Sequence, residues 1–236
     1  MSKDSADTLV DSTSNLTLND SSAAATSTSS NSSSSATATP APIDDLDQMH
    51  PLQNKWSFFL NPPNKGVFGQ EWQSNVKHVT DFATVEYFWG LFNELPPPSQ
   101  LVIGSNYHMF KAGIQPEWED EQNKKGGKWT IAIPRRANDP AAAKQADEAW
   151  LFTLLALIGE QFGADSDEIC GVVIGPRAKE TRLALWTRNG DDEAAVKRIG
   201  QFFKQNIRHE AMISYQLHDE SIKKQSSHRN QAVYQV

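Results

Sequence analysis

Cysteine is nearly absent from this chain, since Cys170 is its only copy. A single cysteine rules out an internal disulfide and fits a reducing compartment. Cys170 lies in the apolar run Ile169–Ile174, where no cationic neighbour is at hand to favour the thiolate. We therefore expect a buried structural thiol there and not a nucleophile.

Aromatic residues are absent from the first 48 positions. This segment is rich in Ser, Thr, Ala and Asn, and its seven Asp against Lys3 account for −6 of the net charge of −7. Such a composition buries too little apolar area to offset the entropy lost on ordering. We expect residues 1–48 to form a disordered tail and residues 49–236 to form one domain, whose last ~15 residues are flexible.

Long apolar runs are also missing, because no stretch reaches the ~18 residues needed to cross a membrane. The start of the chain is acidic and rich in Ser, unlike a secretory signal or an Arg-rich mitochondrial presequence. With little net charge left in the folded part, an anion site has to be a local cluster of Lys and Arg. We expect a cytoplasmic protein, with the nucleus open as a second location.

Short runs of alternating apolar residues are present and predict the strands of one sheet. They are Trp56–Leu60, Tyr107–Lys111, Lys128–Pro134, Ile169–Pro176, Thr181–Thr187 and Met212–His218. Helical spacing predicts three helices at Thr84–Leu95, Ala141–Phe162 and Asp191–Asn206, the first capped by Thr84 and ended by three prolines. Three helices are too few to cover both faces of the sheet. The fold class is therefore α+β, a curved antiparallel sheet with helices on one face and the other face exposed.

Two tryptophans, Trp72 and Trp118, lie in polar surroundings that predict loops. An indole of this kind either folds back as a lid on the core or stays exposed for stacking. Two exposed indoles on separate loops could enclose a flat ring. Glu119 follows Trp118, and its carboxylate can accept the N1-H and N2-H2 pair of guanine. The alternative for Glu119 is a solvated acid in an acidic run.

A turn near Pro176 carries three cations, Arg177, Lys179 and Arg182. Guanidinium groups bind phosphate oxygens bidentately, so this turn suits a polyphosphate, with an ordinary charged hairpin as the alternative. The glycine pair at 126–127 is flanked by lysines that could add positive field, but it lacks the pattern of a phosphate loop. We interpret that pair as a turn. Together the indoles, the carboxylate and the cations predict a guanosine polyphosphate ligand, to which an N7 methyl would add ~0.5–2 kcal/mol of cation–π attraction.

At these residues the chain resembles the eukaryotic translation initiation factor 4E family of mRNA cap-binding proteins. The order and spacing of the matching stretches extend from His50 to about His218, and the stretches are His50–Trp56, Thr84–Trp89, Trp118–Glu121, Gly126–Trp129 and Leu183–Thr187. The resemblance implies an eight-stranded curved antiparallel sheet with three helices packed on its convex face. It also implies binding of the 7-methylguanosine cap of mRNA without bond chemistry, and therefore no catalytic residue, metal or cofactor.

The resemblance assigns roles to the candidate cap site. The rings of Trp72 and Trp118 would enclose 7-methylguanine, Glu119 would bind its edge, and Trp186 would lie near the N7 methyl. The phosphates would contact Arg177, Lys179 and Arg182.

The family also recruits partners through its convex back, which binds helical Tyr-x4-Leu-Φ segments of the initiation factor 4G scaffold and of 4E-binding proteins. The matching positions here are His50, Pro51, Val85, Trp89, Leu151, Leu155 and Gly159. For Leu151 and Leu155 simple core packing is the alternative, and Phe152 stands where relatives usually carry a charged residue. We expect a monomer that links capped mRNA to a scaffold, with no membrane contact.

Two other functions are open at this point. A cap-cleaving hydrolase would need a nucleophile with an oriented base or a metal-binding carboxylate cluster, and the six histidines form no paired motif. A repressor-type relative would bind caps but not the scaffold, whereas the presence of Trp56 and Trp72 favours the translation-promoting type.

Overall fold

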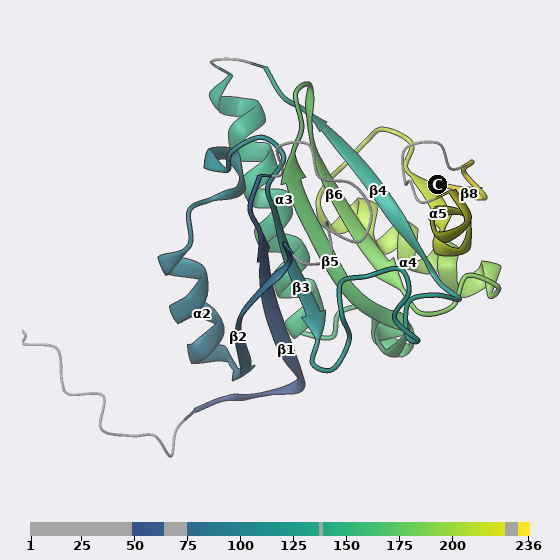
Figure 1. Cartoon of the computed structure of the whole chain (residues 1–236), viewed down its shortest axis with the longest axis horizontal. Helices are drawn as coiled ribbons and strands as arrows, with labels where there is room; N and C mark the ends of the chain where they lie inside the picture. The colour runs from purple at the N-terminus through teal and green to yellow at the C-terminus, as the bar shows by residue number, and fades with distance from the viewer. Residues whose placement is uncertain (1–48, 64–74, 137–138, 225–230) are drawn as a thin grey trace, which may run out of the picture. The chain divides into compact units, whose positions relative to one another are not determined.

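A computed structural model describes residues 49–63, 75–136, 139–224 and 231–236, and the expected tail at residues 1–48 lies outside this part of the chain. The described residues form one curved antiparallel sheet of eight strands in the order β2-β1-β3-β5-β6-β4-β7-β8 (Figure 1). The strands are β1 (Pro51–Asn61), β2 (Lys77–Thr84), β3 (Asn106–Lys111), β4 (Gly127–Pro134), β5 (Ile169–Pro176), β6 (Glu180–Thr187), β7 (Ser214–Leu217) and β8 (Tyr234–Gln235). The predicted fold class is confirmed.

Three helices pack on one face of this sheet, and we call it the helical face. They are α2 (Val85–Glu94), α3 (Pro140–Ile158) and α4 (Glu193–Asn206). Side-chain oxygens cap their N-termini: Thr84 accepts from the Tyr87 N–H, Asp139 from those of Ala141 and Ala142, and Asp192 from that of Ala195. In Figure 1, α3 runs behind the central strands. The predicted Thr84 cap is confirmed.

The main hydrophobic core lies between the helical face and these helices. The strands contribute Trp56, Trp129 and Leu185, and the helices contribute Trp150 and Phe203 among others. The indole N–H of Trp129 donates to the Val196 carbonyl at 2.9 Å, which attaches α4 to β4. Gly200 allows this close approach, because a Cβ there would lie 2.4 Å from a ring carbon of Trp129.

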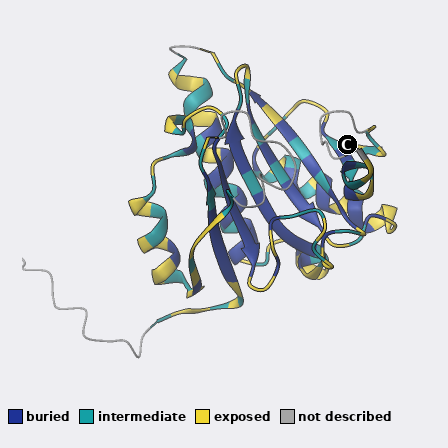
Figure 2. Ribbon diagram, in the orientation of Figure 1, coloured by how far each residue is buried: buried dark blue, intermediate teal, exposed yellow. Residues whose placement is uncertain are grey.

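Alternation along the strands turns the neighbouring residues toward the other side, which we call the opposite face. A second, smaller cluster covers the central part of the opposite face and contains Phe59, Phe110, Ile114, Cys170 and Trp186. All six residues of β3 are consequently buried, and Figure 2 shows the central strands in dark blue. The expectation that the other face is exposed is therefore wrong at the central strands, because aromatic side chains pack there as well.

Several elements differ from the sequence-based prediction. Strands β2 and β8 were not among the six predicted runs, and the last run ends early because His218 begins the short helix α5 (His218–Lys224). Two 3-10 turns, η2 (Pro98–Gln100) and η3 (Gly163–Glu168), connect larger elements. The expected flexibility of the last ~15 residues stays a prediction. Tyr234 and Gln235 pair with β7, and residues 225–230 lie outside the described residues.

The glycine pair, which was predicted to form a turn, lies where a turn ends and β4 begins, since the Gly126 N–H donates to the Asn123 carbonyl at 2.9 Å. Gly127 begins β4, and a Cβ on Gly126 would lie 1.7 Å from the Thr187 carbonyl oxygen. A Cβ on Gly127 would lie 2.4 Å from the carbonyl oxygen of Gln216. The two glycines therefore permit close contact between β4 and its two neighbouring strands.

Within the described ranges, no helix has the length and apolar character needed to cross a membrane.

Candidate functional site

The turn between β5 and β6 presents the predicted cations. The Arg177 N–H donates to the Glu180 carbonyl at 2.7 Å and closes the turn. The Arg177 guanidinium donates to Asn106 Oδ1 at 2.8 Å, while Arg182 forms an ion pair with Glu180. Lys179, at the tip, is exposed. Burial and the neighbouring Arg182 lower the pKa of Arg177, which shows that the two guanidinium groups lie close enough to repel each other.

Lys128 joins this cluster, although it was not among the predicted site residues. It lies on β4 directly opposite Trp186 of β6, with its side chain on the opposite face. Burial first, and then the charges of Arg182 and Arg177, lower the pKa of Lys128 to about 8. Because Lys128 alternates with the core residues Trp129 and Ile131, the sequence predicts that its side chain lies on the other face of the sheet. The strand pairing that brings it to Trp186 cannot be predicted from the order of the chain. Lys128, Arg177 and Arg182 are called the cation cluster below.

A buried histidine lies beside the cation cluster. His108 of β3 is 1% exposed, and burial together with the Arg177 charge lowers its pKa to about 3. It is therefore neutral at physiological pH and adds no further positive charge. Sequence reasoning gave His108 no role, because nothing in the chain order places it near Arg177.

The loop after β3 holds Trp118 and Glu119 on a hydrogen-bonded frame. The Asp120 carboxylate accepts from the backbone N–H groups of Gln115 and Gln122, at 2.9 and 2.8 Å. Asn123 Nδ2 donates to the carbonyls of Gln115 and Glu117, both at 2.8 Å. Asp120 and Asn123 thus fix the backbone on both sides of Trp118, and neither was predicted to have this role.

This loop is also attached to the sheet. The Cys170 thiol donates to the Gln122 carbonyl at 3.3 Å, and burial raises the pKa of Cys170 to about 12. The expectation of a buried structural thiol is confirmed. The loop therefore rests on β5 through a group that does not ionise at physiological pH.

Trp118 is partly buried, and its indole packs against the smaller hydrophobic cluster. Glu119 is exposed. Burial, and then the charges of Glu119 and Asp120, raise the pKa of Glu117, so the carboxylates of this loop lie close together. Trp118 therefore contacts the cluster and still reaches solvent, and stacking of its ring on a ligand stays a prediction.

Trp186 lies in the floor of the opposite face and is 5% exposed. The His218 ring lies 4.1 Å from its ring centroid, and Phe110 contacts it edge-on at 5.4 Å. Burial and the Lys128 charge lower the pKa of His218 well below its usual value, so this ring is neutral at physiological pH. The structure therefore brings Trp186, Lys128, Arg177 and Arg182 onto one face, with Trp118 against the same cluster as Trp186.

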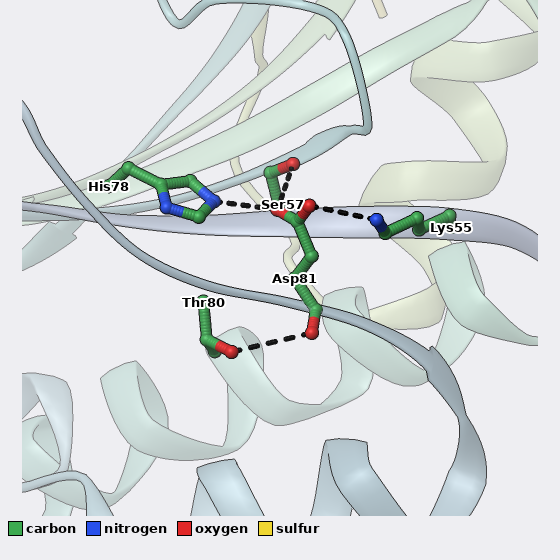
Figure 3. Close-up of polar contacts among 5 residues, drawn as sticks. All are labelled: Lys55, Ser57, His78, Thr80 and Asp81. Atoms are coloured by element: carbon green, nitrogen blue, oxygen red, sulfur yellow. Dashed lines mark hydrogen bonds and ion pairs between the residues drawn. The ribbon is translucent and has the colours of Figure 1, made fainter.

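Trp72 lies outside the described residues, so the predicted pairing of its ring with Trp118 stays a prediction. The strands on either side of it are described and firmly joined. Asp81 of β2 accepts from Ser57 Oγ at 2.8 Å and pairs with His78 at 2.6 Å and Lys55 at 2.9 Å (Figure 3). The hydrogen bond from His78 and those from Lys55 and Ser57 keep the pKa of Asp81 well below its usual value. This cluster holds β2 on β1 despite a register shift next to Phe59.

The predicted partner residues fall into two groups. His50 and Pro51 lie where β1 begins, and the Val85 N–H of α2 donates to the His50 carbonyl at 2.9 Å. The His50 backbone N–H and ring also bind the Glu86 carboxylate, at 3.0 and 2.7 Å. The structure therefore brings His50, Pro51 and Val85 together. Trp89, one turn further along α2, is 37% exposed and packs edge-on against Phe88.

The second group lies on α3. Leu151 and Leu155 are partly exposed and one turn apart, and Leu155 packs against the main core. Gly159 ends the helix, and its N–H donates to the Leu155 carbonyl at 2.9 Å. Phe152 is also partly exposed and packs against the main core. The helix therefore offers an apolar strip to solvent while its inner side fills the core.

Among the described residues, no group of three or more His, Cys, Asp or Glu side chains is arranged to hold a metal ion.

Comparison with known proteins places this geometry in a family. A sequence model of the family described as eukaryotic initiation factor 4E matches residues 51–233. The translation initiation factor isoform 4E of Capsicum annuum is 42% identical over 180 residues, which cover 76% of this chain and 85% of the relative. The initiation factor 4E of Aplysia californica is 42% identical over 190 residues, covering 79% of this chain and 84% of the relative.

Solved structures agree with the sequence comparison. The C. elegans eIF4E-3 chain in complex with the 4E-binding protein Mextli superposes with a TM-score of 0.71 at 34% identity, over 80% of this chain and 99% of that chain. Ascaris suum eIF4E-3 in complex with the m7G cap gives a TM-score of 0.69 at 33% identity, over 80% of this chain and 98% of that chain. The chain described here belongs to the eukaryotic initiation factor 4E family.

Proposed function

We propose that this chain binds the 7-methylguanosine cap of mRNA and recruits a scaffold protein to start translation, without bond chemistry of its own. One observation carries the proposal: Trp118, which precedes Glu119, packs against the cluster that contains Trp186, and Lys128 of the cation cluster lies opposite Trp186 on the same face of the sheet. Relatives of this fold have been solved with caps and with 4E-binding proteins.

The chemistry of the ligand suits this arrangement. Stacking of the base on Trp118, and on Trp72 as the second ring, contributes ~1–3 kcal/mol per base. The N7 methyl makes the ring cationic and adds ~0.5–2 kcal/mol over an indole face, which favours the methylated base over guanine. Glu119 accepts the two hydrogens of the guanine edge, and Trp186 lies next to the methyl.

The geometry of β6 indicates the path of the cap phosphates. Trp186 and Arg182 are four residues apart on one strand, a span of roughly 13 Å. A base at Trp186 therefore directs its phosphate chain toward Arg182, with Lys128 beside the start of this path and Arg177 and Lys179 near its end. Such multiple charge-assisted contacts suit a triphosphate better than a monophosphate.

The partner side lies on the helices. An apolar surface around Trp89, Leu151 and Leu155, bordered by His50, Pro51, Val85 and Gly159, accepts a helical Tyr-x4-Leu-Φ segment of an initiation factor 4G scaffold or of a 4E-binding protein. Because cap and partner bind to different faces, the chain links the two as a monomer. We place this activity in the cytoplasm, with the nucleus as the second compartment, and assign it to residues 49–236.

Two matched tryptophan variants separate the two activities. Trp118→Ala is expected to abolish retention on immobilised 7-methyl-GTP and to leave binding of a Tyr-x4-Leu-Φ peptide within twofold of wild type. Trp89→Ala is expected to abolish binding of the Tyr-x4-Leu-Φ peptide and to leave retention on immobilised 7-methyl-GTP unchanged, because its indole lies on α2 and away from the cation cluster. Calorimetry with 7-methyl-GTP and the peptide measures both.

Elution distinguishes the methylated cap from guanine. The wild-type chain should leave the resin with free 7-methyl-GTP and not with GTP at the same concentration. Equal release by GTP contradicts methyl selectivity. Release of 7-methyl-GMP or 7-methyl-GDP from capped RNA during incubation would contradict a function without bond chemistry.

A further inference from the structure

The hydroxyl of Thr130 is a polar group that the site described so far does not use. Its oxygen is buried and has no hydrogen-bond partner among the described residues. A buried hydroxyl without a partner is costly, and native proteins retain few of them. Thr130 therefore needs an explanation that the described residues do not supply.

Thr130 points to the opposite face, because its neighbours Trp129 and Ile131 both belong to the main core. Directly across from it lie Ala184 of β6 and Ser214 of β7. Lys128 is two residues away on the same strand, a separation of about 7 Å, and Arg182 is a diagonal neighbour at a similar separation. The small side chain of Ala184 thus lies between Thr130, Lys128 and Arg182.

The charges around Ala184 favour an anion. The pKa of Lys128 is lowered by burial and by two guanidinium groups, and no described carboxylate contributes to its titration. Glu180 pairs with Arg182, which lies two residues from Ala184 on β6. An anion above Ala184 would offset the repulsion between Lys128 and Arg182.

Phosphate is the anion that suits a hydroxyl at this place. A phosphate oxygen accepts hydrogen bonds from Lys, Arg and hydroxyl groups alike, and the Thr130 hydroxyl has its proton available. The path from Trp186 to Arg182 passes Ala184, since the three side chains share one face of β6. A water between Thr130 and Ser214 would also use the hydroxyl, but it would not couple it to a ligand.

We propose that the Thr130 hydroxyl turns toward the ligand on cap binding and is a further phosphate-binding group, which donates a hydrogen bond to a cap phosphate held above Ala184 between Lys128 and Arg182. This assignment rests on the proposed cap-binding function. It identifies a contact to the phosphate chain from β4, in addition to the contacts from the β5–β6 turn.

Substitution with valine tests the assignment, because valine keeps the branched shape of Thr130 and removes only the hydroxyl. We expect Thr130→Val to bind 7-methyl-GTP about tenfold more weakly than wild type in calorimetry, as for other hydrogen bonds to charged groups. Binding of the nucleoside 7-methylguanosine, which lacks phosphates, should not change. Titration with the mono-, di- and triphosphate locates the contact, since the loss begins at the phosphate that Thr130 binds.

Two controls accompany this variant. Thr130→Ser retains the hydroxyl and should bind 7-methyl-GTP within threefold of wild type. Thr80→Val makes the same change on the edge strand β2, where the hydroxyl donates to the Asp81 carbonyl, and should leave binding unchanged. Thermal melting of each variant confirms folding.

The results separate the two proposals. Thr130→Val with wild-type affinity for 7-methyl-GTP, while wild type binds, overturns the assignment and leaves cap binding intact. An equal loss for the nucleoside and the triphosphate also overturns it, because the effect would not depend on phosphate. A wild-type chain that fails to bind 7-methyl-GTP refutes cap binding and the role of Thr130 with it.

Discussion

Replacing Lys128 by arginine should change how cap affinity depends on pH. In the free chain, burial and the neighbouring arginines lower the pKa of Lys128 to about 8. The charged form therefore predominates at pH 7 and the neutral form at pH 9. A triphosphate next to the amine favours the charged form, so binding above neutral pH draws in a proton. Affinity therefore falls as the pH rises through the lowered pKa of Lys128.

The size of the effect can be worked out from the same value. A bound state that returns the Lys128 pKa to its usual range makes wild-type affinity fall by about tenfold between pH 7 and pH 9, since one pKa unit corresponds to a factor of ten. Arginine stays charged over this range, so Lys128→Arg should lack this part of the fall. The titration of the ligand itself cancels in the ratio of the two affinities.

Calorimetry with 7-methyl-GTP at pH 7, 8 and 9 measures that ratio. Repeating the pH 8 titration in two buffers with different ionisation enthalpies counts protons, and wild type should take up about 0.5 proton more than Lys128→Arg. Circular dichroism at each pH checks that both chains stay folded. An affinity ratio that is constant from pH 7 to pH 9 would refute the reasoning, because it would mean that Lys128 does not titrate near the ligand.

Three further variants test other parts of the structure. Glu119→Gln should weaken 7-methyl-GTP binding by at least tenfold in calorimetry, because an amide offers one acceptor where the guanine edge needs two, and unchanged affinity would exclude Glu119 from base recognition. Asp81→Asn should lower the free energy of unfolding by about 1 kcal/mol in urea at pH 7, since Asp81 is partly exposed and its ion pairs are screened. Because the folded-state pKa of Asp81 is lowered, its contribution to the free energy of unfolding is present above the usual aspartate range and is lost as the pH falls below it. The difference in unfolding free energy between wild type and Asp81→Asn should therefore narrow in acid. A difference that stays constant would count against this account. Gly200→Ala should lower the free energy of unfolding by about 1–3 kcal/mol in urea, because the new Cβ meets the buried indole of Trp129, and a stabilised variant would show that α4 can shift away at no cost.

The sequence predicted the elements whose own residues determine them. Thr84 caps α2 where the helical spacing begins, and the alternating runs from Trp56 and from Thr181 lie in β1 and β6. Strand β2 was not predicted, because the register shift beside Phe59 breaks its alternation and most of its side chains reach solvent. Strand β8 has two residues, too few for any period.

The candidate site was less accessible to sequence reasoning, because it depends on which strands pair. Nothing in the order of the chain places Lys128 opposite Trp186 or His108 near Arg177, and both follow from the register of the sheet. Trp118 and Arg177 were found because their types and neighbours are unusual in themselves. The ligand assignment for Trp72 relies on the resemblance to the family, as that residue lies outside the described part of the chain.

The burial of the core tryptophans has a spectroscopic consequence. Of the seven tryptophans in the chain, Trp56, Trp129 and Trp150 are at most 2% exposed and lie in the main core, where a nucleotide on the opposite face of the sheet does not reach them. Their fluorescence emission forms a constant background in any titration with a nucleotide. A decrease larger than the share emitted by the other four indoles would therefore report a disturbance of the interior and not a ring stacking on the surface.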